Sequence, residues 1–172
     1  MILSGLRILD EIASGRIAIS PFDRRQLGPN SYDLRLDRRV RVYERAALDA
    51  REDNPTREYE IGEHGALFVP GTVYLASTVE TTETRAPFVP ILEGRSSVGR
   101  LGVQIHATAG FGDCGFCGSW TLEMTVTQPV RLYPDMRICQ IAYFVATEPI
   151  ETYKGKYQNQ IGPVSSLMWK DE

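Results

Sequence analysis

Residues 120–126 read Trp120-Thr121-Leu122-Glu123-Met124-Thr125-Val126, a strict alternation of apolar and polar side chains. Successive side chains of a β-strand point to opposite faces of its sheet. The apolar residues therefore share one face, which we expect to pack in a core, while Thr121, Glu123 and Thr125 share the other. This pattern predicts a strand with the lone carboxylate of Glu123 on its polar face.

Short apolar runs of a similar kind extend to both sides of this strand. They occupy residues 32–36, 66–69, 73–76, 88–92, 102–106, 130–133 and 138–145. Gly and Pro residues separate them, as in the turn signal Pro70-Gly71, and strands do not alternate with helical patterns. The sequence therefore predicts a mainly β barrel, sandwich or jelly roll. Apolar residues at helical spacing over 2–12, followed by Gly15, add one short N-terminal helix.

Length and composition narrow the class of protein. A chain of 172 residues fits one domain, and a net charge of −3 argues against a broad basic surface for duplex nucleic acid. No apolar run reaches the length of a membrane span, and residues 1–7 lack the features of a secretion signal. Three cysteines, an odd and low number, favour a reducing compartment. We therefore expect a cytoplasmic protein that binds neither nucleic acid nor membranes.

The densest chemical signal lies in Glu93-Gly94-Arg95-Ser96-Ser97-Val98-Gly99-Arg100-Leu101-Gly102. Glycines let the backbone approach a ligand, hydroxyls bond anionic oxygens, and arginine binds phosphate with two donors. The segment lacks the Gly-Lys-Ser or Gly-Lys-Thr ending of a Walker loop. A surface turn with solvated arginines is the alternative interpretation.

Glu123 is the candidate proton carrier. If the polar face of its strand lines a pocket, a carboxylate there is suited to moving protons during catalysis. A glutamate on a solvated sheet face is the alternative.

Cys114-Gly115-Phe116-Cys117 has the spacing of zinc and redox sites. Zinc-dependent nucleobase deaminases combine Pro-Cys-x-x-Cys with an upstream His-x-Glu. Here Asp113 precedes the first cysteine, and the upstream histidine reads His106-Ala107-Thr108. We therefore favour structural thiols, with a metal or redox role as the alternative.

The chain from about Tyr153 onward is polar, and it forms either a frayed end or a flexible lid. Its segment Lys156-Tyr157-Gln158-Asn159-Gln160 offers a cation, an aromatic ring and three amides, which could close over a polyphosphate.

Several ordered motifs together resemble the dCTP deaminase family, which shares a superfamily with trimeric dUTPases. The similar segments are residues 28–36, residues 93–102, Thr108-Ala109-Gly110-Phe111 with Asp113, Leu122-Glu123, and Tyr153 with residues 156–162. The resemblance implies a distorted β barrel or jelly roll of the dUTPase-like β-clip type, in one domain over residues 1–172 with 153–172 as a mobile lid. It also implies a homotrimer whose active sites lie between subunits.

The implied reaction is zinc-independent hydrolysis of dCTP to dUTP and ammonia, with Mg²⁺ bound through the triphosphate and no metal site on the protein. The resemblance gives catalytic roles to Glu123, Ser96, Arg100 and Ala109. It gives nucleotide-binding roles to Arg95, Ser97, Asp113, Thr121, Leu122, Tyr153, Lys156 and Gln160.

Departures from the family pattern surround the implied sugar site and lid: Gly112, Cys114 where proline is common, and the tail at 164–169. They leave other substrates open, namely a modified or differently phosphorylated deoxycytidine nucleotide. Residues 109–111 also resemble a branch that goes on to form dUMP and pyrophosphate. A dUTPase without deamination is disfavoured by the Leu122-Glu123 pair. A non-catalytic regulatory homologue is disfavoured by Ser96, Arg100 and Glu123.

Overall fold

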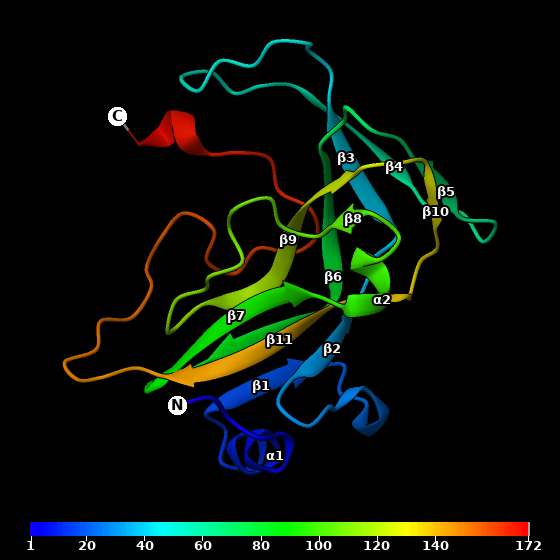
Figure 1. Ribbon diagram of the computed structural model, residues 1–172. Helices are drawn as coiled ribbons and strands as arrows, with labels where there is room; N and C mark the ends of the chain where they lie inside the picture. Colours follow the sequence, from blue (N-terminus) through cyan, green and yellow to red (C-terminus); the bar gives the residue numbers. More distant parts are fainter. Residues whose placement is uncertain (172) are drawn as a thin grey trace.

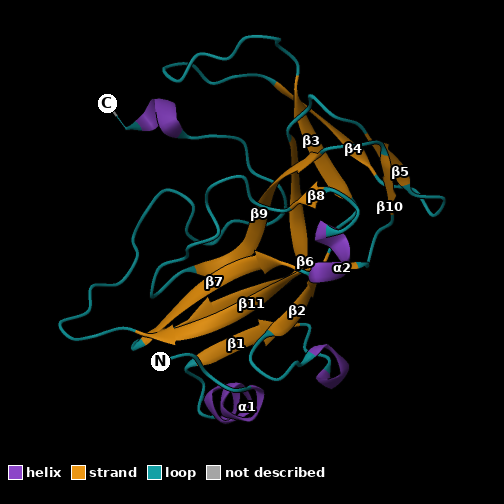
Figure 2. Cartoon of the chain, viewed as in Figure 1, coloured by secondary structure: helices purple, strands orange, loops and turns teal. Residues whose placement is uncertain are grey.

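The computed structural model describes residues 1–171, and most of its regular secondary structure consists of strands (Figures 1 and 2). Its elements are α1 (Gly5–Ala13), β1 (Ile17–Ser20), η1 (Arg24–Gln26), β2 (Tyr32–Arg35), β3 (Arg39–Tyr43), β4 (Thr56–Glu60), β5 (Ala66–Phe68), β6 (Tyr74–Thr84), β7 (Phe88–Gly94), α2 (Ser96–Gly99), β8 (Val103–Gln104), β9 (Cys117–Val126), β10 (Val130–Leu132), β11 (Arg137–Val145) and η2 (Met168–Lys170). The mainly β prediction is confirmed.

Antiparallel strands form three sheets. The largest has the order β4-β3-β6-β9-β8, with β1 also paired to β6. A second sheet has the order β2-β11-β7, and β10 pairs with β5 in a third. Figure 1 shows β7, β11 and β2 stacked side by side at one end, while β3, β6 and β9 extend toward the other.

The predicted alternation in β9 is confirmed. Trp120, Leu122, Met124 and Val126 are buried, whereas Thr121, Glu123 and Thr125 are only partly covered. The buried face packs in one core with fully buried residues of the second sheet, including Tyr32, Leu34 and Tyr143. One face of β9 therefore stabilises the fold and leaves the other available for chemistry.

The predicted N-terminal helix is confirmed: it spans residues 5–13, so it begins after Ile2 and ends before Gly15. The Ser4 hydroxyl accepts a hydrogen bond from the Arg7 N–H and caps its first turn, and Gly15 follows with φ of 75°. Left-handed backbone of this kind favours glycine and ends the helix where the sequence indicated.

The strand predicted at residues 73–76 is only the beginning of β6, which continues to Thr84. Its second part is polar, yet Ser77, Thr78, Glu80, Thr82 and Thr84 are buried. Hydrogen bonds compensate for this burial: Glu80 accepts from the Arg35 N–H, the Arg35 guanidinium and the Gln26 amide. Hydrophobic patterning could not reveal a strand whose buried side chains are polar.

The C-terminal segment crosses the start of β9. Gln160 forms a parallel bridge with Gly118, and the Ser119 N–H donates to the Gln160 carbonyl over 2.9 Å. Tyr153 and Asn159 donate main-chain hydrogen bonds to the carbonyls of Cys114 and Cys117. These contacts place the tail over the polar face of β9. Within residues 1–171, no helix is both long and apolar enough to cross a membrane.

Candidate active site

A pocket of about 580 Å³ opens above the polar face of β9. The loop at residues 106–113 forms one wall, the tail at residues 153–166 covers it, and Tyr43 of β3 and Leu75 of β6 lie at its edge. Pockets that enclose small organic ligands have volumes in this range. The polar face of β9 therefore forms the floor of a pocket, which is the condition that a chemical role of Glu123 requires.

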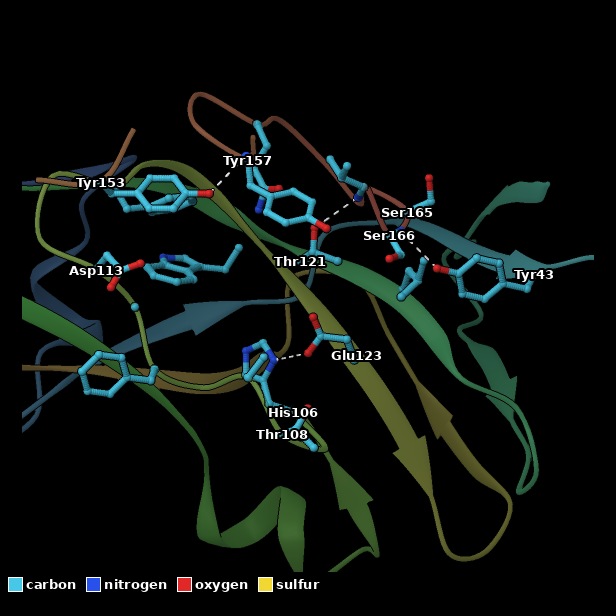
Figure 3. Close-up of a pocket in the computed structure, with 18 residues that line it drawn as sticks. Tyr43, His106, Thr108, Asp113, Thr121, Glu123, Tyr153, Tyr157, Ser165 and Ser166 are labelled. Atoms are coloured by element: carbon cyan, nitrogen blue, oxygen red, sulfur yellow. Dashed lines mark hydrogen bonds and ion pairs between the residues drawn. The ribbon is translucent and has the colours of Figure 1, made fainter. Parts of the chain in front are cut away.

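Glu123 projects from this floor toward the wall (Figure 3). Its Oε2 atom lies 2.6 Å from Nδ1 of His106. The Glu123 side chain is 36% exposed, whereas that of His106 is 7% exposed. The carboxylate is thus held on one side by a buried imidazole and is reachable from the pocket on the other.

Hydrogen bonds to β7 fix the wall. Leu92 donates its N–H to the Gly110 carbonyl over 2.7 Å, and Gly112 donates to the Pro90 carbonyl over 2.9 Å. A Cβ atom at Gly110 would lie 2.5 Å from the Leu92 carbonyl oxygen, so only glycine fits this close approach. This anchoring presents Ala109 and Asp113 to the pocket.

Four hydroxyls accept main-chain hydrogen bonds from the tail, two of them on the tail itself and two on the large sheet. Figure 3 labels the four residues that carry them. Tyr153 accepts a hydrogen bond from the Tyr157 N–H, and Tyr157 accepts one from the Leu167 N–H. Tyr43 accepts one from the Ser166 N–H over 3.1 Å. Thr121 on the floor accepts one from the Val164 N–H. The cover is therefore tied to the pocket at several points along its length.

The pocket brings together half of the residues predicted to act in the site. These are Glu123, Ala109, Asp113, Thr121, Tyr153 and Gln160. The Leu122 side chain is fully buried on the core side of β9, so only its main chain is available to a ligand. Lys156 does not line the pocket, and its ammonium group pairs with Asp171.

The remaining predicted residues lie around α2, outside the pocket lining. This segment, for which a surface turn was the alternative interpretation, contains one helical turn, anchored by buried Val98. Arg95 is half-buried and pairs with Asp33, whereas Ser96, Ser97 and Arg100 are exposed. Among residues 1–171, those lining the pocket include the carboxylates of Glu123 and Asp113 and no lysine or arginine.

Sequence reasoning missed His106 as a partner of Glu123 and considered it only as a zinc ligand. It also missed Tyr43 and Tyr157, whose hydroxyls hold the tail. No local spacing signals these contacts, because each joins segments that the fold alone brings together.

The cysteines are free, and Cys114 is buried. Burial raises the pKa of the Cys114 and Cys117 thiols, and the charges of Asp113 and Glu83, respectively, raise it further. Both thiols therefore favour the less reactive protonated form. Within residues 1–171, no group of three or more His, Cys, Asp and Glu side chains is placed to hold a metal ion.

Comparison with known sequences identifies close relatives. The family model for dCTP deaminase-like domains matches residues 2–146. A protein of Clostridium beijerinckii named "dCTP deaminase, dUMP-forming" is 51% identical over 172 residues, which cover 99% of this chain and 98% of the relative. A protein of Cytophaga hutchinsonii with the same name is 49% identical with the same coverage.

Solved structures share the fold. The 2'-deoxycytidine 5'-triphosphate deaminase from Agrobacterium tumefaciens aligns with a TM-score of 0.68 and 23% identity, over 84% of this chain and 48% of that one. This chain thus spans about half of the Agrobacterium protein. The dUTPase of Staphylococcus bacteriophage 80alpha aligns with a TM-score of 0.51 and 12% identity, over 83% and 97% of the two chains. The predicted dUTPase-like fold is confirmed.

Proposed function

Because this chain belongs to the dCTP deaminase-like family, we propose that it is an enzyme that deaminates dCTP by hydrolysis and then converts the product to dUMP and pyrophosphate. The second step replaces the sequence-based expectation that dUTP is released. Relatives that match nearly the whole chain, at 51% and 49% identity, are named as dUMP-forming. Their names favour the two-step alternative.

Glu123, on the floor of a nucleotide-sized pocket, is the observation that carries the first step. Water is a poor nucleophile toward C4 of cytosine, so a base must accept a proton as the new C–O bond forms. Glu123 takes this proton and passes it to ring N3, which leaves hydroxyl and amino groups on C4. It then moves the hydroxyl proton to the amino group, so that the C–N bond breaks, ammonia leaves and the C4 carbonyl of uracil forms.

Orientation of the water is the task of the groups around Glu123. Ala109 lines the pocket from the wall, and the resemblance gives its main-chain carbonyl, together with the Ser96 hydroxyl, the task of holding the water. Holding the water in line with C4 lowers the entropic part of the barrier. Arg100 favours ionised Glu123 and stabilises negative charge that develops during attack. Asp113 is the proposed contact of the deoxyribose 3'-hydroxyl.

A second copy of the chain is required for this arrangement. The pocket lining contains acidic groups and no lysine or arginine within residues 1–171, which is unfavourable for a triphosphate on its own. Ser96 of α2 and Arg100, the residue that follows this helix, are meanwhile exposed. We therefore propose a homotrimer in which α2 of one subunit completes the pocket of the next.

Magnesium is proposed to arrive with the nucleotide. Mg²⁺ is commonly held by substrate phosphates and waters with few protein ligands, and the described residues offer no cluster of three ligating side chains. Bound in this way, the ion would neutralise phosphate charge during the second hydrolysis. The nucleotide contacts proposed for Arg95, Ser97 and Lys156 would add positive charge and a hydroxyl to the same region.

The test is incubation of metal-analysed, chelator-treated protein with dCTP and magnesium, with ammonia assayed and nucleotides separated by chromatography. We expect equal amounts of ammonia, dUMP and pyrophosphate. Ammonia with accumulating dUTP would restrict the activity to deamination. No ammonia from dCTP would reject the proposal and direct the assay to dCMP, modified dCTP and dUTP. Stoichiometric zinc in active protein would contradict the zinc-free mechanism.

A further inference from the structure

The contact between His106 and Glu123 has a defined direction of donation. An ionised carboxylate has only acceptor oxygens, so Nδ1 of His106 must carry the hydrogen in the 2.6 Å contact to Oε2. Charge-assisted hydrogen bonds of this kind are stronger than neutral ones. One oxygen of Glu123 is therefore occupied before any substrate arrives.

The backbone on both sides fixes the position of the imidazole. Before it, Val103 and Gln104 pair with Val126 and Thr125 of β9, so the chain runs beside the strand that carries Glu123. After it, the loop is tied to β7 through the Gly110 carbonyl. Figure 3 shows the ring projecting from this wall directly toward the carboxylate.

A purely structural role accounts poorly for this histidine. Its Nε2 atom is buried and has no hydrogen-bond partner within residues 1–171. An unpaired buried polar atom lowers stability. A buried imidazole that leaves one nitrogen unpaired while directing the other at the proton carrier is better explained by its effect on that carboxylate.

We propose that His106 is a positioning residue that holds Oε2 of Glu123 through Nδ1–H and leaves Oε1 as the oxygen that exchanges protons. This inference rests on the proposed deamination. With Oε2 fixed, the carboxylate cannot rotate freely, so Oε1 stays directed at the water and the base. The proton from water moves to Oε1 and then to N3. The hydroxyl proton later moves to Oε1 and from there to the amino group.

Two variants of His106 separate this role from packing. The amide nitrogen of Asn can occupy the place of Nδ1, so His106→Asn keeps a donor, whereas His106→Leu removes it. We expect His106→Leu to lower kcat by about tenfold to hundredfold with KM for dCTP changed less than about threefold. His106→Asn should recover most of that loss. His64→Leu, which alters the other, exposed histidine, is the matched control.

The pH profile provides a readout that packing alone would not move. The other titratable groups lining the pocket are Tyr43 from β3, Asp113 from the wall, and Tyr153 and Tyr157 from the tail. Loss of a donor that favours the ionised carboxylate should move the acid limb of the kcat profile to higher pH in His106→Leu and not in His64→Leu.

Each outcome decides between the proposals. If wild-type protein releases no ammonia, the proposed function fails, and the positioning role fails with it. If the wild type is active and His106→Leu keeps both its kcat and its acid limb, only the positioning role is overturned. If His106→Leu does not fold, His106→Phe, which also lacks a donor, takes its place: a lower kcat with an acid limb moved to higher pH supports the role of the Nδ1 donor, and an unchanged kcat and acid limb overturn it.

Discussion

The hydroxyl of Tyr43 on β3 accepts a hydrogen bond from the main-chain N–H of Ser166, a residue 123 positions later in the sequence. Both residues line the pocket. This contact attaches the tail to the large sheet. The tail is therefore held over Glu123 by a bond to another part of the fold, and not only by hydrogen bonds within itself.

Removal of this hydroxyl should loosen the cover. In Tyr43→Phe, we expect KM for dCTP to rise about fivefold while kcat changes little, because a single hydrogen bond of about 1 kcal/mol is lost. Cleavage of the tail by a protease should become faster. Tyr133→Phe, at an exposed tyrosine outside the pocket lining, is the control. Equal KM values for the two variants would show that the contact does not hold the cover.

Substitution of Glu123, the proposed proton carrier, should separate binding from chemistry. Glu123→Gln keeps the shape of the side chain but cannot accept the proton of water, so ammonia release should fall by about 10²–10⁴-fold. Binding of dCTP, measured by calorimetry, should remain within about tenfold of the wild type. The control is Glu63→Gln, at an exposed position. Retained turnover in Glu123→Gln would remove the residue from the mechanism.

The alternation in residues 120–126 was sufficient to predict both the buried face of β9 and the side on which Glu123 lies. That prediction succeeded because strand periodicity depends only on local geometry. The second half of β6 escaped prediction, because buried Glu80 and its threonine neighbours rely on hydrogen bonds from other elements. A hydrophobic pattern does not indicate which hydrogen-bond partners a buried polar side chain will have.

The candidate site shows the same division. Family resemblance predicts that Glu123 and Ser96 belong to one site, yet within one chain Ser96 lies on α2, outside the pocket that Glu123 lines. A motif can predict that residues share a site, but it does not indicate which surfaces would bring them together. His106 and Glu123 are 17 residues apart in the sequence, and their contact depends on the pairing of β8 with β9. A local sequence pattern therefore could not predict it.

An ion-pair cluster on α1 should make stability depend on pH. The Glu11 side chain is fully buried and pairs with Arg7 and Arg16. Burial raises the pKa of its carboxyl group, but the hydrogen bond and charge of Arg16, with the charge of Arg7, outweigh this effect and hold the pKa below its ordinary value near 4.5. Because the pKa is lower in the folded state, this stabilisation is present above about pH 4.5 and is lost as the pH falls further.

Glu11→Gln should therefore lower the free energy of unfolding by about 1–2 kcal/mol at pH 7, since both arginines are about half exposed and their attraction is partly screened. At about pH 3 the loss should be much smaller. Urea unfolding of the wild type and the variant at both pH values measures the difference. An equal loss at both would mean that packing, and not charge, is responsible.

Mixing two inactive variants tests whether sites are shared between subunits. Arg100→Ala removes the guanidinium group that follows α2, and Glu123→Gln removes the proposed proton carrier of the pocket. If each site takes Glu123 from one subunit and α2 from its neighbour, a site is intact only where the first subunit carries Arg100→Ala and the second carries Glu123→Gln. Random trimers formed from equal amounts should then regain about a quarter of wild-type activity.

The recovery depends on subunit exchange, so the variants are unfolded and refolded together, and each is refolded alone as a control. Sedimentation measures the oligomeric state of all samples. A trimer that regains about a quarter of the activity supports shared sites, because neither variant alone contains a complete one. Trimers that stay at the level of the separate variants would place Arg100 and Glu123 of each working site in the same chain, or leave Arg100 outside it. A monomer with full wild-type activity would remove the need for a second copy altogether.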